Sequence, residues 1–506
     1  MNTFSSILRD ELIEQRDYQI NIATTAIKKN TLIIIPTALG KTIITIMALS
    51  KIIEDGGKAI FLAPTKPLVR QHLLSLRKFL KMREDDIVEV TGETRKEDRF
   101  EIYQNGKIIV STPQVIENDL DMFSEIKKDI KVVIFDEAHR AVGDYSYVTI
   151  AKYFSPYSRI IATTASPGGE KERIDEIIKN LSIEALEIRD ENSPDVMEYI
   201  KGIEIKWIRL DMPPELKDIV SDLRELYDRI INKIKNYFPG ISGRSRKEII
   251  SLNELISQQI KQGNKVYYSV ARLRSQAIIL DYLLEFIETQ GVLPFIKYID
   301  ELRSEEKNSL KFINDSEFSL LKERALKLMN QPMRIHTPKM YKILEILKEL
   351  DYQKSIIFCH FRITASILEN TLKENGFSCE KFIGQSSRGE EHGMSQSEQS
   401  NIIGKFRSGE IKILVATQVG EEGLDIPAAD LVIFYEPVPS EIRSIQRRGR
   451  TGRFSKGLAV ILVMNDSRDV SYLYISGKKE KAMKNILKDK KSGESQTTFD
   501  KFVTDD

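Results

Sequence analysis

One ten-residue stretch, Ile33–Thr42, constrains the fold of this chain more than any other. It reads Ile-Ile-Ile-Pro-Thr-Ala-Leu-Gly-Lys-Thr. The short apolar run suits a buried strand that ends at Pro36, and Gly-Lys-Thr then opens a stretch that is predicted to be helical through Leu49. A strand, loop and helix in this order present backbone N–H groups to an anion. The sequence therefore predicts a cradle for the phosphates of a nucleotide.

The residue types of this loop suggest separate roles. Lys41 is expected to reach the β- and γ-phosphates, and Thr42 to hold a magnesium ion. Ala38 stands where related loops often carry glycine, and it would cost about 1 kcal/mol if that position needs a positive φ. An ordinary strand and helix are the alternative reading. The predicted nucleotide-contacting residues here are Pro36, Thr37, Ala38, Leu39, Gly40, Lys41 and Thr42.

Length and charge limit the remaining possibilities. With 506 residues the chain is long enough for two to four domains, and 76 Lys and Arg against 75 Asp and Glu give a net charge of +1. A polyanionic partner would thus have to meet a local basic patch. Two cysteines, Cys359 and Cys379, cannot build a disulfide framework or a four-ligand zinc site, which fits a reducing cytosol. No signal peptide and no apolar run of about 20 residues is found, so we expect an intracellular protein with no membrane partner.

The segments on either side of the loop add candidate contacts. Upstream, Gln19 offers an amide suited to adenine, and Arg16 opens the same helix-like stretch. Downstream, two short buried strands end in Thr65-Lys66 and in Thr112, at what would be one edge of a parallel sheet. These hydroxyl and amine groups are expected to contact nucleic-acid phosphates. A polar helix start and ordinary turns are the alternatives.

A third buried strand, 131–135, runs into Asp136-Glu137-Ala138-His139. A carboxylate in this place suits magnesium bound to ATP, so we expect Asp136 to hold the metal and Glu137 to orient and deprotonate the attacking water. His139 is interpreted as a link to neighbouring loops, including the hydroxyl-bearing segment 164–167. A solvated acidic turn is the alternative.

From about residue 190 the pattern becomes helical. Amphipathic helices are predicted at 215–237, 248–262, 269–289 and 317–329. Basic residues flank them, and DNA contact by Arg244, Arg246 and Lys247 is predicted, with a solvated face as the alternative.

The buried-strand pattern returns near Lys354 and repeats the architecture of the first half without a second phosphate loop. This half is therefore expected to be a partner lobe that completes one nucleotide site. Four arginines lie between residues 447 and 453, and Arg450 and Arg453 are expected to reach the γ-phosphate across a cleft. Arginines supplied in this way accelerate phosphoryl transfer by about 10³-fold or more, and here they would make hydrolysis depend on closure of the cleft.

Taken in order, these motifs resemble the superfamily 2 helicases. The Asp-Glu-Ala-His box, the helical insert and the runs Gly393–Gln396 and Gly423–Asp425 look most like archaeal Hef and the Fanconi anaemia group M family. The resemblance implies an α/β fold of two RecA-like parallel-sheet domains with an all-helical insert between them. It also implies an ATP- and Mg²⁺-dependent helicase or translocase that remodels branched DNA at stalled forks and Holliday junctions. By motif, Asp425 would meet the ribose, Gln446, Arg450 and Arg453 the γ-phosphate, and Thr65, Thr112, Arg362 and Thr417 the tracked strand.

The resemblance also implies an organisation and a set of partners. We expect a first RecA-like domain at 1–190, the insert at 191–330, the second RecA-like domain at 331–485 and a disordered tail at 486–506. Many Hef proteins continue into a nuclease domain, and no Glu-Arg-Lys nuclease core is found here, so a separate nuclease is the expected partner. Within the tail, Gln496, Phe499 and Phe502 resemble a sliding-clamp peptide; a tail that folds back on its own domain is the alternative. The expected location is cytoplasmic and associated with the chromosome.

Two other functions remain open on the sequence. RNA-sensing relatives and Dicer also place a helical insert between their lobes, so a double-stranded RNA helicase or sensor is possible. A nucleotide-gated scaffold that binds junctions with little turnover is the third reading.

Overall fold

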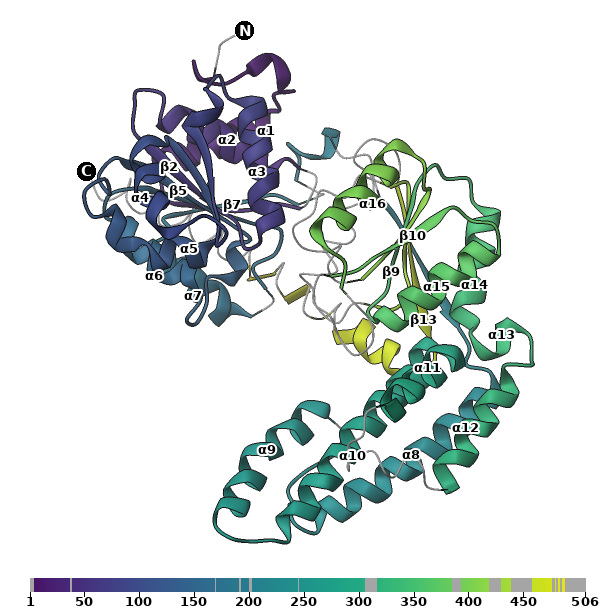
Figure 1. Cartoon of the computed structure of the whole chain (residues 1–506). Helices are drawn as coiled ribbons and strands as arrows, with labels where there is room; N and C mark the ends of the chain where they lie inside the picture. The colour runs from purple at the N-terminus through teal and green to yellow at the C-terminus, as the bar shows by residue number, and fades with distance from the viewer. Residues whose placement is uncertain are drawn as a thin grey trace, which may run out of the picture.

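In the computed structural model, two α/β lobes lie side by side and a bundle of helices extends from the second lobe (Figure 1). This arrangement confirms the predicted fold class of two parallel-sheet domains with a helical insert. The structure describes residues 4–36, 39–168, 170–190, 193–199, 203–243, 245–304, 316–384, 393–417, 429–437, 457–475, 478, 481–482 and 485–486.

Lobe 1 is built on a seven-stranded sheet whose order is β3-β4-β2-β5-β6-β1-β7 and whose strand pairs are all parallel. Separate apolar clusters cover its two faces, which explains why most of its strands read as continuous apolar runs. Its strands are β1 Thr31–Ile34, β2 Lys58–Leu62, β3 Ile87–Val90, β4 Ile108–Ser111, β5 Ile130–Asp136, β6 Arg159–Thr164 and β7 Ala185–Ile188. Its helices are α1 Asp17–Lys28, α2 Lys41–Ile52, α3 Lys66–Phe79, α4 Lys96–Asn105, α5 Pro113–Asn118, α6 Ser146–Phe154 and α7 Lys171–Asn180, with short 3-10 turns η1 Asp10–Leu12, η2 Glu84–Asp86, η3 Leu120–Phe123, η4 Ala138–Arg140 and η5 Met197–Tyr199.

Lobe 2 contains a six-stranded parallel sheet in the order β10-β11-β9-β12-β13-β8. Its strands are β8 Ile203–Leu210, β9 Ser355–Phe358, β10 Cys379–Phe382, β11 Ile413–Ala416, β12 Leu431–Phe434 and β13 Gly457–Met464. Its helices are α14 Pro338–Glu349, α15 Arg362–Glu374 and α16 Gln396–Ser408.

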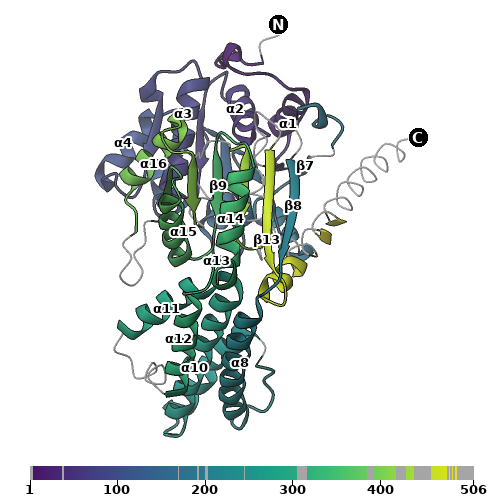
Figure 2. The ribbon, with the colours of Figure 1, turned by 90° about the vertical axis from the view of Figure 1, so that its right-hand side faces the viewer.

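The strand β8 changes the domain organisation expected from the sequence. Residues 203–210 fall inside the predicted insert, 191–330, but they pair with β13 as an edge strand of the lobe 2 sheet (Figure 2). The insert is therefore enclosed by lobe 2 in the sequence, because β8 precedes it and α14 follows it. The edge position explains the missed strand, since Glu204 and Lys206 interrupt its apolar residues and face solvent.

The insert is a bundle of helices that continues directly from β8 into α8. Its helices are α8 Pro214–Lys235, α9 Arg246–Lys261, α10 Tyr267–Glu285, the π-helical turn η6 Phe286–Gln290, α11 Val292–Ser304, α12 Ser316–Leu328 and α13 Met333–His336. One apolar core runs from these helices onto one face of the lobe 2 sheet and includes residues such as Leu223, Leu284, Ile343 and Val415. The insert and lobe 2 thus share a core.

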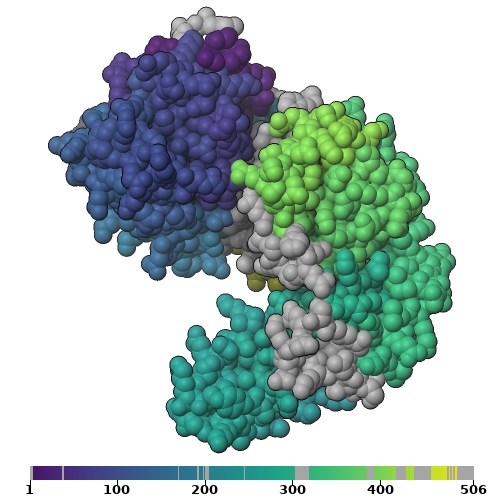
Figure 3. All heavy atoms as spheres, viewed as in Figure 1, coloured from purple at the N-terminus to yellow at the C-terminus, as the bar shows by residue number. Residues whose placement is uncertain are grey.

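The surface is hollowed between lobe 1 and the free end of the insert (Figure 3). In the described ranges, no helix is both long enough and apolar enough to cross a membrane.

Candidate nucleotide and nucleic-acid sites

The predicted phosphate loop lies against helix α1. Gly40 has φ +80°, and a Cβ atom there would lie 2.5 Å from Gln19 Nε2, so both the backbone conformation and the close approach require glycine. Tyr18 Oη donates to the Leu39 carbonyl at 2.8 Å. Gln19 is 4% exposed, and its Oε1 is buried without a hydrogen-bond partner in the described part of the chain. An unsatisfied amide oxygen beside the loop fits a donor such as the amino group of adenine.

Lys41 begins α2 immediately after this glycine. Its Nζ donates to the Ile35 carbonyl at 3.3 Å, and its charge lies close enough to Asp136 to favour the ionised carboxylate. Thr42 follows at the second position of the helix and is partly buried. The structure therefore places the lysine close to the aspartate, and Thr42 directly follows that lysine on α2.

Asp136 ends β5 and is held from two sides. His72 Nε2, from α3, lies 2.8 Å from Asp136 Oδ2, and Thr163 Oγ1, from β6, donates to Asp136 Oδ1 at 2.7 Å. Burial opposes ionisation, but these two contacts and the Lys41 charge outweigh it and lower the pKa of Asp136 to about 2. The carboxylate is therefore anionic at neutral pH. An anionic carboxylate fits Mg²⁺, an ion commonly held by one or two carboxylates and by substrate phosphates, and the Thr42 hydroxyl is the second oxygen donor that the sequence predicts for it.

Glu137 follows in a left-handed conformation with φ 52°, which costs a non-glycine residue about 1–3 kcal/mol. His139 Nδ1 lies 3.3 Å from Glu137 Oε2 and 3.2 Å from Thr164 Oγ1. Thr164 Oγ1 in turn accepts from the Ser166 backbone N–H at 3.2 Å. The acidic turn is thus linked through His139 to the end of β6 and the loop after it.

The predicted nucleic-acid residues of lobe 1 lie at one edge of its sheet. Thr65 and Thr112 precede α3 and α5, and they follow the neighbouring strands β2 and β4. Thr65 Oγ1 is buried without a hydrogen-bond partner among the described residues, whereas Lys66 pairs with Glu93 at 2.7 Å. Two helix N-termini at one edge, with an unsatisfied hydroxyl, suit contact with phosphates.

The corresponding residues of lobe 2 also share an edge. Arg362 begins α15 after β9 and donates to the Gly384 carbonyl at 3.3 Å. Thr417 follows β11, the neighbour of β9, and is 4% exposed.

The basic residues predicted to contact DNA in the insert have different surroundings. Lys247 is exposed on α9, whereas Arg246 pairs with the buried carboxylates of Asp281 and Glu285. Arg246 therefore does not lie on the basic surface loop that the sequence suggested, because its charge is used inside the bundle.

Some predicted site residues lie outside the described residues and stay predictions. They are Thr37, Ala38, Arg244, Asp425, Gln446, Arg450, Arg453, Gln496, Phe499 and Phe502. The sequence analysis in turn missed Tyr18, His72 and Thr163, whose contacts to the loop and to Asp136 come from separate elements. Only the position of Tyr18 beside Gln19 gave a signal.

A Gly-Lys-Thr loop and an acidic strand end on one parallel sheet, joined to a second parallel sheet, are the features expected of a two-lobed ATP-driven enzyme of the helicase class. Comparison with known proteins gives the family. The model for DEAD/DEAH box helicases matches residues 16–174, and the model for the helicase conserved C-terminal domain matches residues 338–455. The crystal structure of the Hef helicase domain from Pyrococcus furiosus is 38% identical, with a TM-score of 0.70, over 93% of this chain and 99% of that one. The chain belongs to the DEAD/DEAH-box helicases of the Hef type, a family of ATP-hydrolysing helicases.

Curated relatives agree on the family and differ in the nucleic acid that they name. A Methanocaldococcus jannaschii protein, provisionally named an ATP-dependent RNA helicase, is 37% identical over 95% of this chain. The DEAD-box ATP-dependent RNA helicase FANCM of Arabidopsis thaliana is 31% identical over 90%, and the ATP-dependent DNA helicase mph1 of Sclerotinia sclerotiorum is 29% identical over 92%. The chain spans 62%, 35% and 41% of the lengths of these relatives.

Proposed function

We propose that this chain is an ATP-dependent DNA helicase or translocase that remodels branched DNA, such as stalled forks and four-way junctions, in replication-fork repair. The observation that carries the proposal is the convergence of Lys41, Asp136 and Glu137 at the ends of β1 and β5, in a chain similar to the Hef helicase domain along nearly its whole length. The DNA helicases named mph1 among its relatives support DNA as the substrate.

The chain's own residues supply distinct parts of the proposed reaction. Lys41 neutralises the β- and γ-phosphates. Thr42 and Asp136 would hold Mg²⁺, which would neutralise charge that develops on the phosphates. Glu137 orients and deprotonates the attacking water, and the unsatisfied oxygen of Gln19 accepts a hydrogen bond from adenine. Gln446, Arg450 and Arg453 complete the site from lobe 2, while Asp425 binds the ribose.

Contact between the site and nucleic acid is proposed to run through the acidic turn. His139 contacts both Glu137 and Thr164, so a shift of the loop after β6 would move Glu137, the residue proposed to orient the water. Thr65 and Thr112 on lobe 1, with Arg362 and Thr417 on lobe 2, grip the tracked strand. Closure of the lobes then moves one pair relative to the other.

The test is ATP turnover with linear, forked and four-way DNA of equal length and with duplex RNA. Forked and four-way DNA are expected to stimulate turnover most. Lys41→Ala is expected to abolish turnover and to leave fork binding in place. Lys51→Ala is the matched control, because Lys51 lies on the same helix but is paired with Glu54 at the surface. Equal stimulation by linear and branched DNA would exclude the preference for branches.

Duplex RNA is the second candidate substrate, because two relatives carry the name RNA helicase. It would replace DNA in the proposal if duplex RNA stimulated turnover more than every DNA in the panel. Branch processing that survives in Lys41→Ala would instead favour a junction-binding scaffold.

The proposal also bears on partners and location. A fork-remodelling helicase acts inside the cell and on the chromosome. A sliding clamp bound through Gln496, Phe499 and Phe502 would deliver it to forks, and a separate nuclease would cut the structures that it exposes. Loss of clamp affinity on deletion of residues 496–506 tests the first of these partners.

A further inference from the structure

Three buried carboxylates lie along one helical face of the insert. Asp281 and Glu285 end α10 and Glu288 lies in the π-helical turn η6; the three residues are 6%, 6% and 2% exposed. Their spacing of four and three residues stacks them on one side. Several negative charges removed from water are costly unless each has a partner, so this face requires countercharges.

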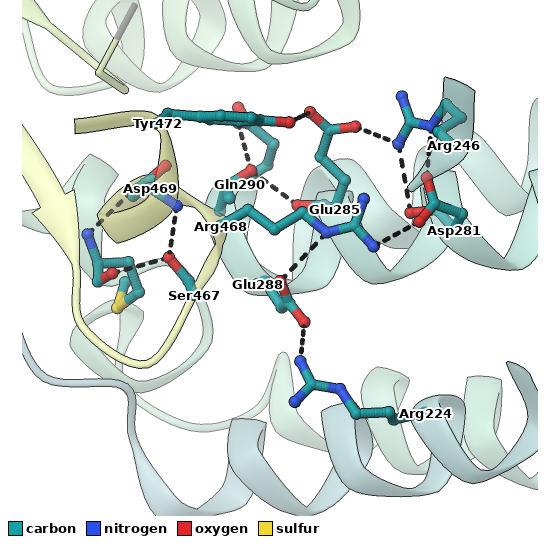
Figure 4. Close-up of polar contacts among 12 residues, drawn as sticks. Arg224, Arg246, Asp281, Glu285, Glu288, Gln290, Ser467, Arg468, Asp469 and Tyr472 are labelled. Atoms are coloured by element: carbon teal, nitrogen blue, oxygen red, sulfur yellow. Dashed lines mark hydrogen bonds and ion pairs between the residues drawn. The ribbon is translucent and has the colours of Figure 1, made fainter. Parts of the chain in front are cut away.

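The insert itself supplies two of these positive charges. Arg246, from α9, pairs with Asp281 and lies 2.5 Å from Glu285, with its guanidinium 3.7 Å from the centre of the Tyr282 ring. Arg224, from α8, lies 2.5 Å from Glu288 (Figure 4). Among the described residues of the insert, two arginines face three carboxylates, so one more positive charge is needed to balance them.

Lobe 2 supplies the third positive charge. Arg468, in the segment after β13, reaches Asp281 Oδ1 at 2.7 Å through Nη2 and lies 3.5 Å from Glu288 Oε2 through Nε. Tyr472 Oη donates to Glu285 Oε1 at 3.1 Å (Figure 4). Every carboxylate of the face therefore has one partner from the insert and one from lobe 2.

The segment that carries Arg468 is itself fixed to lobe 2. The next residue, Asp469, is fully buried, pairs with the buried Lys339 of α14 at 2.5 Å, and accepts from the Met464 backbone N–H at 2.8 Å. A second connection lies nearby, where Gln290 Oε1 accepts from Thr364 Oγ1 at 2.9 Å and the Gln290 carbonyl accepts from Tyr435 Oη at 3.0 Å. Arg468 thus extends from a rigid base in lobe 2 into the insert.

We propose that Arg468 is a positioning residue that locks the insert to lobe 2, so that the two move as one body when lobe 2 closes on lobe 1. The continuous apolar core between them supports this unit, and Arg468 fixes its angle. The inference rests on the proposed function to the extent that the insert contacts the DNA being remodelled. In that case the energy of ATP binding reaches the DNA through this junction.

The direct test measures distances in the full chain. Spin labels are attached to Gln262→Cys near the free end of the insert, and to either Lys412→Cys on lobe 2 or Glu125→Cys on lobe 1, all exposed positions. The two native cysteines are buried. In the parent protein, a non-hydrolysable ATP analogue with Mg²⁺ is expected to change the distance to lobe 1 and to leave a narrow distribution to lobe 2.

Arg468→Gln removes the charge at similar length and is expected to broaden the distance distribution between insert and lobe 2 severalfold. Arg468→Lys keeps the charge but cannot bridge two carboxylates as a planar fork does, so it is expected to rescue the width only in part. Tyr472→Phe removes a single hydroxyl and provides a variant that perturbs folding little. Lys217→Ala is the matched control, because Lys217 and Asp466 also join insert to lobe 2, at 2.9 Å, but at the exposed surface.

A functional readout accompanies the distances. Arg468→Gln is expected to keep ATP turnover without DNA and to lose most of the DNA-stimulated turnover and fork remodelling. An unchanged, narrow distribution in Arg468→Gln would overturn the lock, as would equal broadening in Lys217→Ala. The distances need no DNA, so they test the lock even if the parent protein does not remodel forks, a result that would count against the proposed function alone.

Discussion

At the scale of single residues, side chains of lobe 1 itself hold the Asp136 carboxylate in place. Asp136 has both oxygens engaged, and the His72 imidazole that engages Oδ2 is 3% exposed and packs on the Phe61 ring with centroids 4.4 Å apart. His72 also lies on α3, the helix that begins after Thr65 at the predicted nucleic-acid edge. A contact with the bound strand would therefore be transmitted along α3 to the proposed metal ligand.

His72→Ala is expected to weaken Mg²⁺-nucleotide binding by about tenfold or more, the usual effect of removing a residue that orients a metal ligand. Among the described residues, the Asp136 carboxylate is then held by the Thr163 hydroxyl alone. The affinity for a fluorescent nucleotide is measured with Mg²⁺ and with a chelator, and only the first is expected to fall. An equal loss in both conditions would mean that the substitution damages the lobe as a whole. His72→Gln, which keeps a donor, should restore part of the affinity.

The thiols give a second residue-scale prediction. Burial raises the pKa of Cys379 to about 11, so that about one molecule in a thousand carries its thiolate at pH 8. Cys359 is fully buried. Native protein is therefore expected to react with Ellman's reagent only slowly at pH 8, and both thiols are expected to react at once in denaturant. Rapid reaction of one thiol in the native protein would contradict this placement.

At the scale of elements, Gly291 controls the turn between η6 and α11. It has φ +93°, and a Cβ atom there would lie 2.8 Å from the His336 carbonyl oxygen. Both the backbone conformation and the close approach of the His336 carbonyl exclude a side chain at this position. The turn connects η6, next to the helix of the buried carboxylates, to α11.

Gly291→Ala is expected to lower the free energy of unfolding by about 2–3 kcal/mol, since it combines left-handed strain with overpacking. Gly376→Ala is the matched control, because Gly376 has φ +81° but a Cβ there meets nothing within 4 Å. The control should lose only about 1 kcal/mol from backbone strain. Urea titration of the two variants measures the difference. Equal losses of unfolding free energy would show that the contact with the His336 carbonyl does not destabilise the Gly291→Ala variant.

The elements also show what the sequence determines locally. Strands such as β1, β5 and β9 were predictable because a strand buried on both faces is a continuous apolar run. Helix α11 was not among the predicted helices; its Pro294 lies in the first turn, where proline is tolerated, although proline disrupts the interior of a helix. The loop, the acidic turn and the threonines that follow β2 and β4 could be proposed as site residues because each directly follows a recognisable strand.

The contacts between residues far apart in the sequence were not predictable in the same way. His72 and Asp136 are 64 residues apart, and Arg468 and Asp281 are 187 apart. No local pattern marks such pairs, because they depend on how whole elements pack. For the same reason Arg246 resembled a surface arginine until its buried partners were seen.

At the scale of the whole molecule, the cores divide the chain differently from the sequence of motifs. Lobe 1 has its own apolar clusters on both sheet faces, whereas lobe 2 has its own cluster on one sheet face and shares the cluster on the other face with the insert. Contacts within a shared core are lost together, so two cooperative units are expected. The chain passes from lobe 1 to lobe 2 before β8, and among the described residues Ile486, which follows β13 in the sequence, packs back on the lobe 1 core.

Hydrogen exchange in increasing urea is therefore expected to show one midpoint for peptides of lobe 1 and another that is common to the insert and lobe 2. Trp207, the single tryptophan, lies on β8 and reports the second midpoint independently by fluorescence. An ATP analogue with Mg²⁺ should raise the first midpoint, because ligands stabilise the unit that holds them. Arg468 joins the insert to lobe 2 through an ion pair with Asp281, in addition to the shared apolar core. Arg468→Gln should therefore give the insert a lower urea midpoint than lobe 2, whereas Lys217→Ala should leave the two midpoints equal. If the insert of the parent protein exchanged with its own midpoint, the shared core would not couple its unfolding to that of lobe 2. The energy of cleft closure would then have to reach the DNA by another path.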